Sequence, residues 1–149
     1  MSRTMYRGPN GRQPVTTDAR VCAAALLPAT FVTETATQFT QATAPGPHVR
    51  LLANRDFYST EQLTANEPLL TAYASGDTGI AYVLEPGQRY LVAAAAATYS
   101  YGQALTVAAA GRAAAASTGN VVVAFSRHVG AVSAGALIEV EIANFYAQP

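Results

Sequence analysis

Apolar and polar positions alternate most regularly near the C-terminal end of the chain, in the stretch ALIEVEIANFY. Apolar residues stand at every second position there, and the residues between two of them are Glu139 and Glu141. The apolar set is Ile138, Val140 and Ile142. Alternation with a period of two is typical of a strand that buries one face. The pattern therefore predicts a half-buried strand whose solvated face carries the two glutamates.

Further short runs of strand-forming residues lie upstream. The stretches IAYVL and RYLVA flank Pro86 and Gly87, a pair favoured in type II turns because proline fixes φ and glycine accepts a positive φ. This pattern predicts a hairpin or a tight connection between two strands. The stretches ALTVAAAGRAAAAS and NVVVAF add more apolar runs, the first of them divided by Gly111.

Residues 90–117 are so rich in alanine that helix propensity alone favours a helix. A helix through 93–116 would have to cross Gly102 and Gly111, and it would offer no charged face to water before Arg112. Methyl groups also fit where two backbones or two sheets approach closely. We therefore predict short strands with thin packing surfaces, and helix stays the alternative for residues 93–97.

The first half of the chain is less regular. Residues 1–20 have several Gly and Pro residues and no apolar period, which predicts an extended N-terminal arm that does not pack by itself. The stretch ARVCAAALLPATFVTET is interpreted as a short helix over 19–27 or a buried strand, and residues 60–65 as a short helix. We expect one β-rich domain over residues 21–149, with the strongest strand signals at 80–146, and a mainly β fold with at most one or two short helices.

Composition excludes several classes of protein. The formal net charge is zero and 12% of the residues are charged, so no overall field attracts nucleic acid or an anionic membrane. All nine cations are arginines, four of them within the first twenty residues, which suits protein interfaces, although codon bias is an alternative explanation. With Cys22 as its one cysteine the chain cannot form an internal disulfide. The first residues lack the apolar core of a secretory signal, and 91–110 is too polar to span a bilayer, so we expect a soluble chain.

Candidate catalytic groups are sparse. His48 and His128 have no metal ligand at a suitable spacing, and Ser126 with His128 lacks the third group that orients a nucleophile's base. No glycine-rich phosphate loop is present. We therefore expect no catalytic, metal or cofactor site and no enzyme activity. Five tyrosines could stack on sugar rings, which keeps a carbohydrate-binding module as an alternative; they are Tyr73, Tyr82, Tyr90, Tyr99 and Tyr101.

The chain from Gly76 onward resembles the head-decoration, or capsid cement, proteins of tailed bacteriophages. The resemblance is carried by GDTGIAYVLEPGQRYLV, YSYGQALTVAAAGRAAAA and VVVAFSRHVGAVSAGALIEVEIANFY, about half of the chain. Its short motifs are the step from Gly102 to Leu105, the Gly111 that precedes a run of small residues, and an ending of the form aGxxIxVxI. In this chain the ending is formed by Ala134, Gly135, Ile138, Val140 and Ile142.

The resemblance implies a β-barrel-like or β-tulip-like body that assembles as a homotrimer. It implies that the protein binds the major capsid protein on the outside of an expanded capsid and stabilises the capsid by bridging capsomers. It further implies no cofactor, no nucleic-acid or membrane partner, and a location on the capsid surface of the virion after synthesis in the host cytoplasm.

We expect the N-terminal arm to supply the capsid contacts of such a protein. The residues assigned to this role are Arg3, Tyr6, Arg7 and Arg12. A tail or head-fibre component is an alternative within virion proteins, and the carbohydrate-binding β-module is an alternative outside them.

Overall fold

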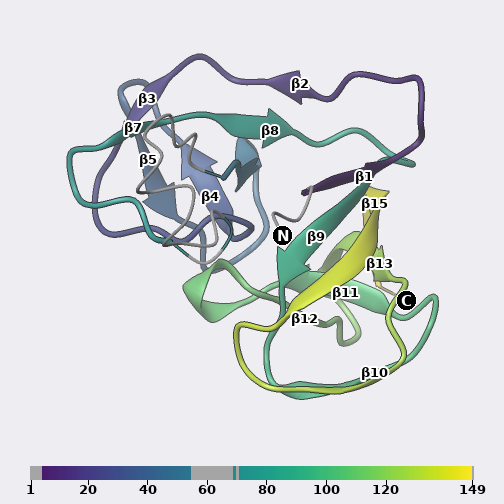
Figure 1. Ribbon diagram of the computed structural model, residues 1–149. Helices are drawn as coiled ribbons and strands as arrows, with labels where there is room; N and C mark the ends of the chain where they lie inside the picture. The colour runs from purple at the N-terminus through teal and green to yellow at the C-terminus, as the bar shows by residue number, and fades with distance from the viewer. Residues whose placement is uncertain (1–4, 55–68, 70, 149) are drawn as a thin grey trace.

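The computed structural model describes residues 5–54, 69 and 71–148, and strands dominate this part of the chain (Figure 1). The described strands form a six-stranded sheet, a seven-stranded sheet and a two-stranded ribbon. The predicted mainly β fold is confirmed. The described residues include a 3-10 turn, η2 (Ala109–Gly111). Within the described residues, no helix has the length and apolar character needed to cross a membrane.

The six-stranded sheet is antiparallel throughout and belongs mostly to the second half of the chain. Its strands lie in the order β1 (Tyr6–Gly8), β9 (Arg89–Ala93), β15 (Leu137–Ala147), β13 (Val121–Ser126), β11 (Ala104–Val107) and β12 (Ala113–Ala115). The ribbon beside it pairs β10 (Ala97–Tyr99) with β14 (Gly130–Val132).

The seven-stranded sheet belongs to the first half of the chain, and Figure 1 shows it beside the six-stranded sheet. Only the β3–β5 pair is parallel among its described strands. The strands lie in the order β2 (Val15–Thr16), β8 (Ala81–Val83), β6 (Val49–Leu52), β4 (Phe31–Glu34), β5 (Gln38–Gln41), β3 (Arg20–Cys22) and β7 (Thr78–Gly79). The stretch interpreted as a helix or a strand thus contains a short strand, β3, and the helix expected at 60–65 lies outside the described residues.

The alternation near the C-terminus is confirmed by β15. Ile138, Val140 and Ile142 are at most 2% exposed, and the glutamates between them lie on the other face. The strand then continues to Ala147 past an irregularity, because Ala124 of β13 pairs with Ile142 whereas Val122 pairs with Tyr146. A bulge of this kind bends a strand and changes the direction of its side chains.

The alanine-rich segment forms strands, as predicted. β9 ends at Ala93 and β10 begins at Ala97, so no helix covers residues 93–97. The backbone N–H of Ala93 donates to the carbonyl of Ala29, with a distance of 2.8 Å, and Ala29 and Ala94 are fully buried. Ala29 precedes β4, so this bond joins the two sheets at a place where only small side chains fit.

A second close approach lies at η2, which packs against β4. Gly111 has a φ of +66°, and a Cβ atom added to it would overlap the backbone oxygen of Phe31 and the side chain of Gln41. The Gln41 amide donates to the same Phe31 oxygen at 2.8 Å. The glycine that divides the alanine run is therefore required by both the backbone conformation and the space.

The turn at Pro86–Gly87 forms as predicted, and it connects the sheets. The N–H of Gln88 donates to the carbonyl of Glu85 at 3.2 Å, and Gly87 has a φ of +87°. β8 before the turn belongs to the seven-stranded sheet and β9 after it to the six-stranded sheet. Of the two interpretations left open by the sequence, the tight connection is correct and the hairpin is not.

Residues 5–20, expected as an arm that does not pack by itself, run extended across both sheets of their own chain. β1 pairs with β9 and β2 pairs with β8, and Met5 is 2% exposed within the core. The order of this segment comes from ladder hydrogen bonds to distant strands rather than from an apolar face of its own.

We expect Gly111→Ala to lower the free energy of unfolding by roughly 2–4 kcal/mol. The left-handed backbone accounts for about 1 kcal/mol, and the overlap with Phe31 accounts for a further 1–3 kcal/mol, roughly. Urea denaturation followed by circular dichroism measures the change.

Gly119→Ala is the matched control for this substitution. Gly119 has a φ of +88°, but no atom lies within 4 Å of an added Cβ. It should cost only the backbone strain, about 1 kcal/mol. Equal losses in the two variants would show that η2 and β4 do not require a glycine for their close contact.

Candidate functional site

Ser126 and His128, which the sequence analysis set aside as a catalytic pair, are joined by hydrogen bonds. Ser126 is 1% exposed, and its hydroxyl accepts the backbone N–H of His128 at 3.1 Å and donates to the backbone carbonyl of the same residue at 3.0 Å. The hydroxyl therefore fixes the loop after β13 through the backbone of His128. Across the described residues, no group of three or more His, Cys, Asp and Glu side chains converges in a way that could hold a metal ion.

Most of the tyrosines proposed to stack on sugars are packed inside the protein. Tyr73, Tyr90 and Tyr99 are at most 4% exposed, and burial raises the pKa of the Tyr90 and Tyr99 hydroxyls. Tyr82 is half-buried, with its ring 5.2 Å from that of Tyr90. Only Tyr101, at 63%, is well exposed among the five. The alternative of a carbohydrate-binding module therefore loses three of its five rings, which fill the core.

The arm residues assigned to capsid contact lie along the first segment, except for Arg3, which lies outside the described residues. The Tyr6 ring packs edge-on against Tyr90 at 5.4 Å, and its hydroxyl donates to the carbonyl of Pro9 at 3.0 Å. Arg12 lies 3.8 Å from a Glu85 carboxylate oxygen, and its side chain is 59% exposed. These residues thus contact their own chain, and Arg12 keeps the freedom to bind a further partner.

Glu139 and Glu141, expected on a solvated face, lie beside arginines. Arg7 and Arg127 approach Glu139 at 3.7 and 3.6 Å, and Arg127 also lies 4.0 Å from Glu141. The guanidinium of Arg127 lies 5.5 Å from the centre of the Tyr101 ring. The outer face of β15 is therefore close to neutral, which suits contact with another protein more than a row of bare carboxylates would.

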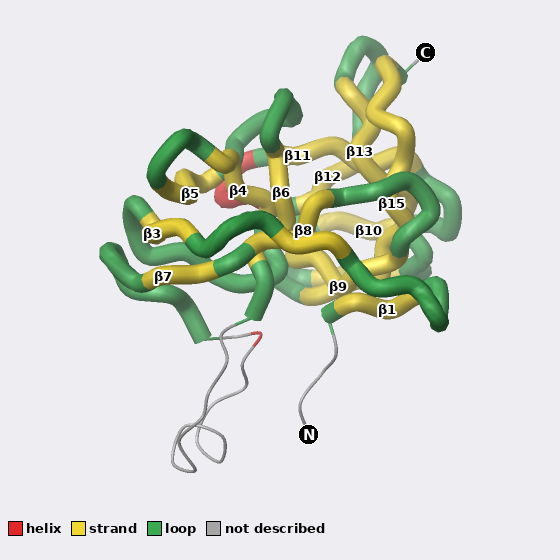
Figure 2. Tube along the Cα trace, turned by 90° about the horizontal axis from the view of Figure 1, so that it is seen from above, coloured by secondary structure: helices red, strands yellow, loops and turns green. Residues whose placement is uncertain are grey.

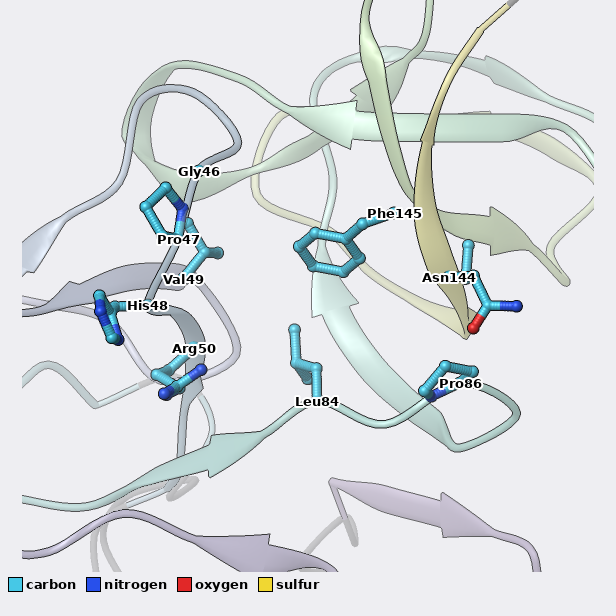
Figure 3. A pocket seen from close by; sticks show the side chains of 10 residues that line it. Gly46, Pro47, His48, Val49, Arg50, Leu84, Pro86, Asn144 and Phe145 are labelled. Atoms are coloured by element: carbon cyan, nitrogen blue, oxygen red, sulfur yellow. The ribbon is translucent and has the colours of Figure 1, made fainter.

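A cleft of about 320 Å³ opens between the two sheets (Figure 3). Loop and strand residues of the seven-stranded sheet line one side, the β8–β9 connection lines another, and the bulge of β15 lines the third. The lining residues are Gly46, Pro47, His48, Val49, Arg50, Leu84, Pro86, Ala143, Asn144 and Phe145. Most of this surface is apolar, with Arg50, His48 and Asn144 as polar groups.

A charge cluster lies next to the cleft and holds Arg50 in place. The Glu34 carboxylate accepts the Nε–H groups of Arg20 at 2.9 Å and of Arg50 at 3.3 Å. The hydrogen bond from Arg20, together with the charge of Arg50, lowers the pKa of Glu34 against the opposing effect of burial. In the described part of the chain, Glu34 is the one carboxylate that pairs with these two arginines, and the Arg50 side chain reaches no other ion-pair partner. The cluster therefore has one uncompensated positive charge.

Comparison with known proteins gives a likeness of fold. No family model matches the chain, and no curated protein matches it in sequence. Among solved structures, the crystal structure of the head fiber gp8.5 N base in bacteriophage phi29 matches with a TM-score of 0.55. The two are 11% identical, and the match covers 92% of this chain and 100% of that one. The chain therefore shares its fold with a phage head-fibre base.

This likeness bears on the resemblance noted from the sequence. That resemblance was to proteins of phage heads, and the neighbour found by fold is also a phage head protein. At 11% identity, the likeness shows a shared fold and nothing finer.

Glu34→Gln should destabilise the protein by roughly 1–2 kcal/mol near neutral pH, the value of charged hydrogen bonds reduced by solvent screening. The pKa of Glu34 in the folded state lies below its usual value of 4.5. Its stabilising contribution is therefore complete above about pH 4.5 and is lost as the pH falls through the folded-state pKa. Urea unfolding between about pH 7 and pH 2 measures this difference. A gap between wild type and variant that stays constant down to the lowest pH would contradict the assignment.

Proposed function

We propose that this chain is a structural protein of a phage head that attaches to the outer surface of the capsid. The observation that carries the proposal is the fold shared with a head-fibre base, which extends over 92% of this chain and all of that one. The likeness extends over nearly the full length of both chains, so the shared fold is that of the whole neighbouring chain and not of one part of it.

The surface of the chain supports the proposal. Large apolar side chains are exposed at several places, among them Val129 at 72%, Tyr101 at 63% and Tyr146 at 41%. The charged side chains near them on β15 are paired, so these places have little net charge. Apolar groups beside paired charges are typical of surfaces that bind other proteins.

In this proposal the partner is the major capsid protein, and the chain acts as a homotrimer that stabilises the capsid by bridging capsomers. A symmetric trimer gains affinity because each bound subunit raises the effective concentration of the next. The protein contributes binding alone, with no catalytic step.

A head-fibre base is the second candidate, and the structural neighbour favours it directly. The end of β15 also supports it. Figure 2 shows the β13–β15 pair extending away from the rest of the molecule, where residues 144–147 are exposed. A base that carries a fibre needs such a projecting element, whereas a decoration subunit needs broad contacts with capsomers.

Sedimentation of the purified protein with expanded, DNA-free heads of the phage that encodes it tests the attachment. We expect saturable binding to expanded heads with a fixed number of copies per head. Electron microscopy of gold-labelled particles then separates the two candidates, since a fibre base leaves a projection at each labelled site and a decoration subunit leaves a smooth surface. Absence of binding to heads would contradict the proposed function.

Arg12→Ala should weaken attachment to heads roughly tenfold, or about 1.4 kcal/mol, because its side chain is more exposed than that of Arg7, the other arginine assigned to capsid contact that the structure describes. Folding stability should change by less than about 1 kcal/mol, as for an exposed ion pair. Deletion of the whole arm is a less specific test, because it also removes Met5 from the core and β1 from β9.

Arg112→Ala is the matched control, because it also replaces an arginine by alanine but at a position outside the arm. It should leave attachment to heads unchanged. Equal attachment of wild type and Arg12→Ala would show that the arm does not contribute through Arg12.

A further inference from the structure

Two residues that line the cleft have backbone conformations that side chains rarely adopt. His48 has a φ of +60° and Phe145 a φ of +51°. They lie far apart in the sequence, one before β6 of the seven-stranded sheet and one in β15 of the six-stranded sheet. A positive φ is uncommon for a residue other than glycine, less so for histidine, and it is a clear outlier for a bulky residue such as Phe145; such outliers gather at sites that bind ligands.

Burial of the Phe145 side chain offsets only part of the strain in its backbone, because the side chain is still 37% exposed. It follows from the bulge in β15, where the pairing with β13 passes from Ile142–Ala124 to Tyr146–Val122. Figure 3 shows the Phe145 ring turned into the cleft, facing Leu84. The bulge therefore directs a large apolar side chain towards a space that the protein itself leaves open.

The cleft combines this apolar wall with a directed positive charge. Glu34 binds Nε of Arg50, and the terminal nitrogens of Arg50 have no carboxylate partner in the part of the chain that the structure describes. The other carboxylate near the cleft, Glu85, follows Leu84 and lies 3.8 Å from Arg12. A ligand that complements the cleft therefore brings a carboxylate for Arg50 and an apolar group for Phe145 and Leu84.

We propose that this cleft binds an extended acidic peptide segment of a protein partner, with a carboxylate side chain on Arg50 and an apolar side chain against Phe145 and Leu84. In an extended chain, residues two positions apart point to the same side, so one segment can supply both groups. The volume of about 320 Å³ is at the small end of binding pockets and accommodates side chains rather than a folded element. The proposal rests on the proposed function only in placing this segment on a head protein.

The acetylated and amidated pentapeptide AEALA is a probe with this spacing. Titration into the isotope-labelled full-length protein, followed by backbone amide resonances, should give saturable shifts confined to the non-proline residues of 46–50, 84–85 and 143–145. The charge-swapped peptide AKALA should give none. Absence of saturable shifts up to about 10 mM AEALA, a concentration roughly tenfold above a millimolar dissociation constant, would overturn the proposal. Equal binding of both peptides would overturn the role of Arg50.

Phe145→Gly is the most informative variant, because glycine accepts the positive φ without strain. It should bind AEALA at least about tenfold more weakly while its melting temperature stays the same or rises. Tyr146→Gly, the matched control, removes a neighbouring exposed aromatic residue that does not line the cleft. It should lower the melting temperature and leave peptide binding unchanged. The opposite pattern, with stability lost and binding kept in Phe145→Gly, would show a purely structural role.

Arg50→Gln provides a second test that does not depend on the backbone of β15. It should reduce AEALA binding to the level of AKALA, while Arg20 keeps Glu34 paired. Peptide binding without attachment to heads would reject the proposed function and keep the cleft. Attachment to heads that Phe145→Gly leaves unchanged, together with no peptide binding, would reject the cleft and keep the function.

Discussion

The two-sheet arrangement depends on a backbone contact that only small side chains permit. The N–H of Ala93, at the end of β9, donates to the carbonyl of Ala29, just before β4, and both residues are at most 5% exposed. Ala29 is itself held at a φ of +61°. Two residues after Ala29, at Phe31 of β4, Gly111 brings η2 against the backbone. A larger side chain at any of these positions would push the sheets apart, because buried atoms leave no free volume to absorb it. The alanine content of the chain thus determines the distance between the sheets.

Local patterns in the sequence predicted the elements whose character is set by near neighbours. The alternation of β15, the turn at Pro86–Gly87 and the strands of the alanine-rich segment all follow from periodicity or turn chemistry. The sequence could not assign β8 and β9 to different sheets, because the same turn serves a hairpin and a crossing between sheets. Nor could it place β1 and β2, since strands of two or three residues have no period and are ordered by hydrogen bonds to distant partners.

The candidate site shows the same limit more strongly. Sequence reasoning named the arginines and tyrosines, which are conspicuous residue types, and most of those tyrosines belong to the core. It missed Arg50 and Phe145, whose roles depend on a salt bridge to Glu34 and on a bulge in β15. A weak signal was present: the alternation of β15 breaks at Ala143 and Asn144, and a break in a regular strand pattern is where a bulge is expected. The sequence around Arg50 or Phe145 does not reveal that these two residues, from different sheets, line the same cleft.

The electrostatic character of the surface depends on how carboxylates and arginines are paired, and less on how many charged residues the chain has. Glu85, Glu139 and Glu141 each lie within 4.0 Å of an arginine nitrogen, so the formal neutrality of the sequence is also local neutrality around these carboxylates. A surface of this kind cannot attract a partner over long distances, because its fields cancel within a few ångströms. Association must then rely on shape, apolar contact and a few directed hydrogen bonds. For the proposed attachment to a capsid in many copies, such short-range contacts are sufficient, because repetition raises the total affinity to which each weak contact contributes.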